Sequence, residues 1–158
     1  MAHAASSSNG FGMPWFALCV AFALHVLDEA TTGFLAVYNP TVTAMRERWG
    51  WFPMPNFTFR TWLTALVIGL AFCFALTPLA ARGARAMRPF AWFFAGVHLL
   101  NATGHTLATI FGQTVSTVTF PRPAPGFYSS PLLFIGSIWL IVRLRQTAPS
   151  KTPQHLPA

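Results

Sequence analysis

Residues 13–38 read MPWFALCVAFALHVLDEATTGFLAVY, an apolar run in which Asp28 and Glu29 stand side by side. A transmembrane helix needs about 20 apolar residues, so the run is long enough to cross a bilayer. A carboxylate near the centre of such a helix costs about 2.5–3.5 kcal/mol on insertion scales. Two adjacent acids, with His25 one turn upstream, are therefore expected to face the interior of a helix bundle and to form a functional site.

The composition of the whole chain is that of a membrane protein. Of the 158 residues, 54% are hydrophobic and 8% are charged, whereas a soluble domain has about 25% charged residues. The net charge of +7 does not indicate nucleic-acid binding, because the Arg residues cluster in short segments between apolar runs. Cys19 and Cys73 lie inside apolar runs without CxxC spacing, and we interpret both as small buried hydrophobic residues.

Four membrane spans are predicted, at residues 13–38, 61–81, 89–112 and 128–142. They predict one domain, residues 13–145, with an all-α fold: an integral membrane four-helix bundle. Residues 1–12 and 146–158, which contain His3 and His155, are expected to be disordered tails. The first apolar run is interpreted as a retained span and not as a cleaved signal. Residues 39–60 are predicted to form a long outer loop whose Trp and Phe residues cap the bundle at the membrane interface, or less favourably act as a lid.

The basic residues predict the orientation of the bundle. Four spans place both termini and the second connection on one side, which carries six basic residues, whereas the other side carries four. The positive-inside rule then places both termini in the cytoplasm, and we expect a bacterial inner-membrane protein. The six are Arg82, Arg85, Arg88, Arg143, Arg145 and Lys151, and the four are Arg46, Arg48, Arg60 and Arg122.

Polar side chains form one stripe on each of two predicted spans. His25, Asp28 and Glu29 are spaced i, i+3, i+4, which places them on one helix face. On the third span, Asn101 and His105 share a face, with His98 on the same stripe two turns from His105. Neither stripe can face lipid without leaving polar groups unsatisfied. The two stripes are therefore expected to face each other, and His98 is more simply explained as a packing residue.

The fourth predicted span is short and follows a Pro-Gly turn. Ser129 or Ser130 is expected to cap its helix, with Pro131 at the first helical position. The segment from Pro131 to Val142, about 12 residues, is too short for a full crossing. The helix is therefore expected to start inside the membrane and to aim its free N–H groups at the His/carboxylate cluster. Gly126 and Ser129 are then expected to shape a substrate-binding pocket mouth.

Three short segments carry a resemblance to a known family. HVLDE at residues 25–29, NATGH at residues 101–105 and PGFYS at residues 125–129 resemble, in order, the H-x-x-E-E, N-x-x-x-H and P-G-x-x-T motifs of the HXXEE-domain family. The resemblance spans about residues 15–140 and implies a small integral membrane protein with its site at these motifs. Asp28 replaces the first Glu and Ser129 replaces the Thr of the family pattern, and each keeps the functional group. The family name describes motifs and implies no activity.

The residue types at the two stripes favour a metal site. His25, Glu29 and His105 form a two-His, one-carboxylate set suited to zinc or iron. Asp28 is expected to act as general base or protonated partner, and Asn101 to orient substrate or His105. The prediction is an intramembrane enzyme, a hydrolase or an oxidoreductase, that acts on a small apolar or lipid-like substrate.

Three alternatives remain open at the level of sequence. Two adjacent acids beside a His can also perform metal-free acid–base chemistry, as in an isomerase or cyclase of terpenoid or sterol-like substrates. Intramembrane acids and His residues also occur in proton- or metal-coupled carriers, which four spans without an inverted repeat make less favourable unless the protein forms a homo-oligomer. The third alternative is a purely structural polar clasp between helices.

Overall fold

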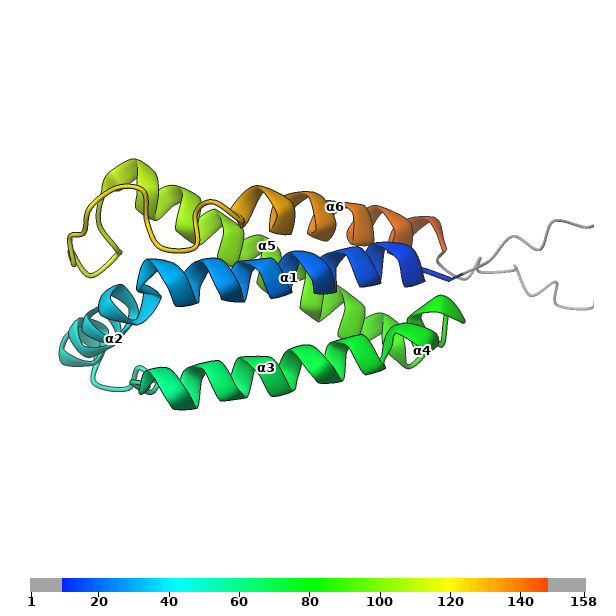
Figure 1. Ribbon diagram of the computed structural model, residues 1–158, viewed down its shortest axis with the longest axis horizontal. Helices are drawn as coiled ribbons and strands as arrows, with labels where there is room; N and C mark the ends of the chain where they lie inside the picture. Colours follow the sequence, from blue (N-terminus) through cyan, green and yellow to red (C-terminus); the bar gives the residue numbers. More distant parts are fainter. Residues whose placement is uncertain (1–9, 148–158) are drawn as a thin grey trace, which may run out of the picture.

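The computed structural model describes residues 10–147, and the regular secondary structure within this range is helical (Figure 1). The prediction of an all-α fold is thus confirmed for these residues. The helices are α1 (Gly12–Thr32), α2 (Phe34–Trp49), α3 (Phe59–Ala75), α4 (Thr77–Ala81), α5 (Met87–Phe111) and α6 (Ser130–Gln146). Of the predicted tails, 1–12 and 146–158, residues 1–9 and 148–158, with His3, Lys151 and His155, lie outside the described residues, whereas Gly12 and Gln146 belong to helices.

Helix α1 lies in the middle of the bundle. Helix α6 packs along both α1 and α5, and α3 lies on the other side of α1 (Figure 1). The start of α1, the short α4 and the end of α6 lie at one end of the bundle, where the Arg143 guanidinium donates to the Gly10 carbonyl over 3.2 Å. Helix α2 and the connection between α5 and α6 lie at the opposite end (Figure 1).

The core is aromatic near the first turn of α1. The Trp15 ring is fully buried and lies 5.7 Å from the ring of Phe90 and 4.8 Å from the ring of Phe94, between centroids. Its indole N–H donates to the Cys73 carbonyl over 3.0 Å, a partner that a buried indole needs. This one side chain therefore connects α1 to both α3 and α5. Phe11 is also fully buried, so the packed region begins before the boundary drawn at residue 13.

The first predicted span is too long. Helix α1 ends at Thr32, because Gly33 adopts a left-handed conformation with φ of 77° and donates its N–H to the Glu29 carbonyl. This is an αL termination of the kind that glycine favours. Helix α2 then leaves in a new direction (Figure 1). Half of the predicted outer loop, residues 39–49, is therefore helical and not irregular.

The rest of the outer connection, residues 50–58, is hydrogen-bonded to α2. Asn39 donates from Nδ2 to the Phe57 carbonyl over 2.9 Å and accepts from the Phe57 N–H over 3.0 Å. Arg46 donates to the Met54 carbonyl. Trp51 is 75% exposed, so the short segment before α3 presents aromatic surface while its backbone is held in place.

The other predicted spans correspond to helices with shifted ends. Residues 61–81 contain α3 and α4, which meet at Leu76. Pro78 lacks the N–H that an uninterrupted helix would supply to Phe74, which explains the break. Helix α5 covers the third predicted span, and α6 starts at Ser130 and continues four residues beyond the predicted end at residue 142.

Helix α6 packs closely against α1 at Gly136. A Cβ atom added at Gly136 would lie 3.2 Å from Leu18 Cδ1 and 3.3 Å from Leu18 Cα. We therefore expect Gly136→Leu to lower the free energy of unfolding in detergent by about 1–3 kcal/mol, the range for overpacked cores. Gly69→Leu on α3 is the matched control, because its Cβ would meet no atom within 4 Å. Thermal unfolding measures both, and equal stability of the two variants would contradict the packing described.

Candidate metal centre

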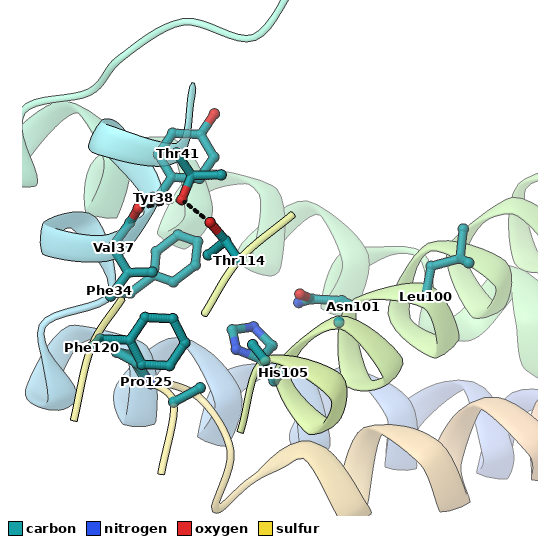
Figure 2. Close-up of a pocket in the computed structure, with 13 residues that line it drawn as sticks. Phe34, Val37, Tyr38, Thr41, Leu100, Asn101, His105, Thr114, Phe120 and Pro125 are labelled. Atoms are coloured by element: carbon teal, nitrogen blue, oxygen red, sulfur yellow. Dashed lines mark hydrogen bonds between the residues drawn. The ribbon is translucent and has the colours of Figure 1, made fainter. Parts of the chain in front are cut away.

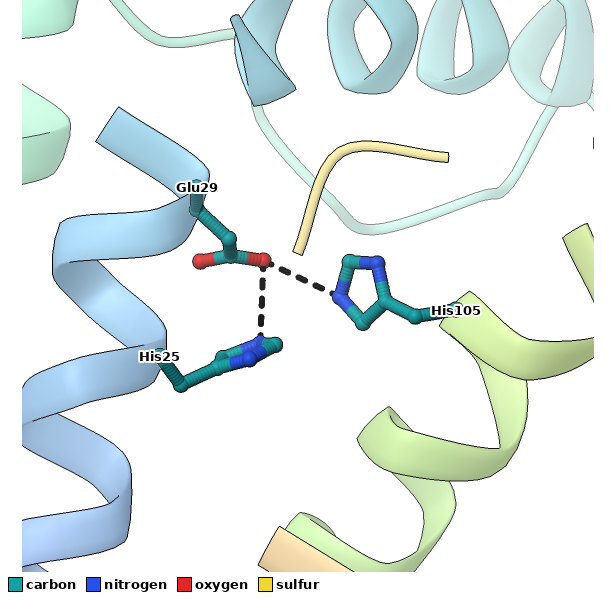
Figure 3. Close-up of side chains that lie close together, drawn as sticks. All are labelled: His25, Glu29 and His105. Atoms are coloured by element: carbon teal, nitrogen blue, oxygen red, sulfur yellow. Dashed lines mark ion pairs between the residues drawn. The ribbon is translucent and has the colours of Figure 1, made fainter. Parts of the chain in front are cut away.

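His25, Glu29 and His105 converge between α1 and α5 (Figure 3). Glu29 Oε1 lies 3.4 Å from His25 Nε2 and 3.1 Å from His105 Nε2. The rings of His25 and His105 are 4.8 Å apart, between centroids. All three side chains are buried, with 0%, 5% and 7% of His25, Glu29 and His105 exposed. The predicted convergence of the two polar stripes thus occurs at these three residues.

The three residues have the spacing that a metal ion needs. Their potential ligand atoms lie within 4.8 Å of one another. Nitrogen and oxygen ligands at about 2.0–2.1 Å from a tetrahedral zinc ion lie about 3.4 Å apart, close to the two separations measured from Glu29 Oε1. Two neutral imidazoles and one carboxylate are also a common donor set for a catalytic ion. The group can therefore hold a metal ion.

The Pro-Gly turn closes the site from the side of α6. Gly126 has φ of 82°, and a Cβ atom there would lie 2.7 Å from His105 Cε1 and 3.0 Å from His25 Cε1. Its N–H donates to Thr32 Oγ1 over 3.3 Å, and Ser130 Oγ donates to its carbonyl over 2.8 Å. Glycine is required here both by the positive φ and by the contact with the two imidazoles.

Asp28 does not join Glu29, although the two are adjacent in sequence. Its Oδ2 accepts two hydrogen bonds from Ser129, one from the backbone N–H and one from the hydroxyl, each over 2.8 Å. The free N–H at the start of α6 therefore points at a carboxylate, as predicted, but that carboxylate is Asp28. Ser129 occupies the N-cap position, yet its hydroxyl does not cap the helix as expected; it contacts Asp28 and His25.

Asn101 contacts His25, whereas the sequence predicted that it orients substrate or His105. Its Nδ2 lies 3.0 Å from His25 Nε2, so it orients His25 and not His105. His98 lies apart from the three convergent residues. Its ring packs 4.4 Å from the rings of Phe22 and Phe94, between centroids, and its buried Nδ1 has no hydrogen-bond partner among the described residues. His98 is thus a packing residue, as the sequence favoured.

An apolar pocket of about 420 Å³ opens beside the site (Figure 2). Asn101 and His105 contribute polar atoms to its wall, and Phe34, Tyr38 and Phe120 are its aromatic lining. Phe34 lies 5.8 Å from His105, between ring centroids. The sequence analysis missed these aromatic residues. Gly33 was the available signal, because a helix that ends there turns Phe34 and Tyr38 back over the site.

The chain matches no protein-family model, no curated protein and no solved structure. The resemblance to the HXXEE-domain family therefore remains a prediction that depends on the three sequence motifs.

The close contact at Gly126 gives a specific test of the site. Gly126→Ala is expected to destabilise the protein more than Gly33→Ala. Both substitutions place alanine at a similar positive φ, 82° and 77°, but the Cβ at residue 33 would meet no atom within 4 Å. The left-handed conformation alone costs about 1–2 kcal/mol. Thermal unfolding in detergent measures the additional loss at Gly126, and an equal loss in both variants would show that the turn does not press on the imidazoles.

Proposed function

We propose that this protein is an integral membrane enzyme that uses a divalent metal ion, held by His25, Glu29 and His105, on a small apolar or lipid-like substrate. The observation that carries the proposal is the position of this buried group beside an apolar pocket that shares His105 with it. The proposed architecture is a four-helix membrane bundle made of α1, α3 with α4, α5 and α6.

The exposed surface supports a membrane location. The segments Gly12–Thr32 and Phe59–Ala81 are apolar and long enough to cross a membrane. Helix α3 is also largely uncovered, with Val67, Ile68 and Phe72 each more than half exposed. Such a surface suits lipid and would be costly in water. We further propose cytoplasmic termini and a bacterial inner membrane, since the end of the bundle at the first and last described residues carries more Arg residues.

The donor set supports zinc or iron as the ion. A bound ion of this kind polarises a substrate oxygen and lowers the pKa of a coordinated water. Burial of Glu29 and both imidazoles limits the access of bulk water that would compete with a substrate for the ion. The Asn101 amide orients His25. Asp28 remains hydrogen-bonded to Ser129 and so holds the turn before α6 against the site. This arrangement supports a hydrolase or an oxidoreductase.

The pocket supports an apolar substrate with one polar group. Asn101 and His105 contribute polar atoms on the side of the buried group, and Thr41 and Thr114 contribute hydroxyls elsewhere, whereas most of its wall is apolar. A second hollow of about 510 Å³ shares Gly104, Ala108 and Thr114 with it and is lined by the exposed Leu107, Phe111 and Val115. A substrate whose polar end reaches His105 can therefore extend its apolar part along α5 toward lipid.

Membership of the HXXEE-domain family is part of the proposal. The three motif segments lie far apart in sequence, yet His25, Asn101 and Ser129 contact one another directly or through one shared ring. A common site is the simplest reason for three such motifs to recur together.

Metal-free acid–base chemistry is the second candidate function. The observation that favours it is the direct contact of Glu29 Oε1 with both imidazoles, at 3.4 Å and 3.1 Å. Groups this close can share a proton and exchange it with a substrate in the neighbouring pocket. An isomerase or a cyclase of terpenoid or sterol-like molecules would use the site in this way, and a proton- or metal-coupled carrier is the less favoured use.

Metal content separates the two candidates. Protein purified in detergent is expected to contain close to one zinc or iron ion per chain by inductively coupled plasma mass spectrometry, and His105→Ala and Glu29→Gln are expected to lose it. Glu29→Gln should also abolish activity while expression is retained, because the amide is a poor metal ligand of nearly the same size.

His98→Leu is the matched control for this measurement. It removes a buried imidazole that lies outside the group, in an apolar environment that accepts leucine. It should therefore keep its metal. Folded wild-type protein without metal would overturn the metal-dependent proposal and favour the acid–base one, and full activity in Glu29→Gln would overturn both.

The wall of the pocket gives a test of the substrate class. Gly104 lines both hollows along α5, and a Cβ there would meet no atom within 4 Å. Gly104→Leu should therefore fold normally and fill the space. We expect it to reduce photolabelling of Phe34 and Tyr38 by a diazirine-bearing fatty alcohol at least several-fold, measured by peptide mass spectrometry. Gly96→Leu, elsewhere on α5 and equally unobstructed, should label like the wild type; unchanged labelling in Gly104→Leu would contradict the assigned pocket.

A further inference from the structure

Ser129 lies between His25 and Asp28, two polar side chains of α1. Its buried Oγ is 2.8 Å from His25 Nδ1, 2.8 Å from Asp28 Oδ2 and 3.3 Å from the Gly126 carbonyl oxygen. A hydroxyl has one proton to donate. Only one of these three neighbours can therefore accept the hydroxyl proton. Any other neighbour that forms a hydrogen bond with Oγ must donate its own proton to an Oγ lone pair.

The carboxylate is the strongest of the three acceptors. Hydrogen bonds to an ionised group are shorter and about twice as strong as neutral ones, and the Asp28 contact is 0.5 Å shorter than the one to Gly126 (2.8 Å against 3.3 Å). With the hydroxyl proton on Asp28, the 2.8 Å contact to His25 requires Nδ1 to donate to Oγ. A neutral imidazole carries one N–H only, so Nε2 is left with its lone pair.

The other side of the ring leads to the same assignment. Asn101 Nδ2 lies 3.0 Å from His25 Nε2, and an amide nitrogen donates and does not accept. With the amide oriented as in this structure, Nε2 is the acceptor. The contacts come from two separate elements, α5 and the turn before α6, and both favour the same tautomer. Nε2 is also the atom that lies 3.4 Å from Glu29 Oε1.

We propose that Ser129, oriented by Asp28, is a positioning residue that holds His25 as the Nδ1–H tautomer and so leaves Nε2, the ring nitrogen 3.4 Å from Glu29 Oε1, without a proton. The inference rests on the proposed function in one respect: Nε2 is the atom that would bind the ion. Metal-binding histidines usually donate their other N–H to a carboxylate or carbonyl, which fixes the tautomer and raises the basicity of the ligand. Here a serine hydroxyl lies between the imidazole and the carboxylate.

Ser129→Ala separates this role from a structural one. The substitution removes only the hydroxyl: the backbone N–H of residue 129 still donates to Asp28 Oδ2, and Ser130 still donates to the Gly126 carbonyl. The start of α6 therefore stays anchored and the variant is expected to fold, with a lower melting temperature because the buried His25 Nδ1–H loses its acceptor. Ser129→Thr keeps a hydroxyl and is the conservative variant that should preserve the tautomer.

The first measurement is the tautomer itself, in full-length, chelator-treated protein. Long-range ¹H–¹⁵N correlation spectra of ¹⁵N-histidine-labelled protein in detergent, with His25 assigned from a His25→Gln variant, report which ring nitrogen carries the proton. We expect a single Nδ1–H form in the wild type and in Ser129→Thr. In Ser129→Ala, where Asn101 alone still favours that form, we expect a mixture of tautomers. An Nε2–H form in the wild type, or an unchanged Nδ1–H form in Ser129→Ala, would overturn the inference.

The second measurement is zinc affinity, by competition with a chromophoric chelator. Loss of an outer hydrogen-bond partner of a metal ligand typically costs about 10–100-fold in affinity, so Ser129→Ala should bind zinc that much more weakly than Ser129→Thr. Equal affinity in the two variants would overturn the inference and leave the proposed metal site intact. A fixed tautomer in protein that binds neither zinc nor iron would support the inference and overturn the metal-dependent function.

Discussion

The rest of the structure depends on one constraint: the polar stripe of α1 is buried and must be satisfied by protein groups, because a buried polar group without a partner is costly. His25 and Glu29 lie on this stripe and are buried, and Asp28 beside them is half-buried. Their partners come from α5 and from the turn before α6. Helix α1 thus occupies the middle of the bundle for a chemical reason, since only there can its polar groups be covered from both sides.

Glycines at two positions allow the partners to come close enough. Gly126 brings the turn backbone against the two imidazoles, where any side chain would collide. Gly33 ends α1 one turn after Glu29 and lets α2 fold back, which places Phe34 over His105. The site is therefore closed by backbone on one side and by aromatic rings on another. A buried polar group enclosed in this way experiences a low dielectric environment, in which each hydrogen bond or ion contact is strengthened.

The spacing of polar residues predicted which faces of α1 and α5 are polar. It did not predict which residue each polar side chain contacts. The i, i+3, i+4 spacing on α1 correctly indicated one polar face, and its meeting with His105 followed because two such faces must cover each other. The same spacing could not separate Asp28 from Glu29, which are 100° apart around the helix and reach different neighbours. Nor could it show that Asn101 contacts His25. The αL turn at Gly33 was missed because the apolar run continues through it, although glycine after a polar stripe is a common helix end.

The tautomer of His25 bears on what the site contains. If Nε2 carries no proton, then His25 Nε2 and Glu29 Oε1, 3.4 Å apart, are two acceptors facing each other in a buried space. In this structure the Asn101 amide N–H, 3.0 Å from Nε2, occupies that lone pair, so a metal ion shared with His105 would have to replace the Asn101 contact. A purely structural clasp would use the opposite tautomer, in which Nε2–H donates to Glu29 directly. The contacts of His25 with Ser129 and Asn101 favour the proposed Nδ1–H form instead, in which Nε2 has a lone pair for a cation.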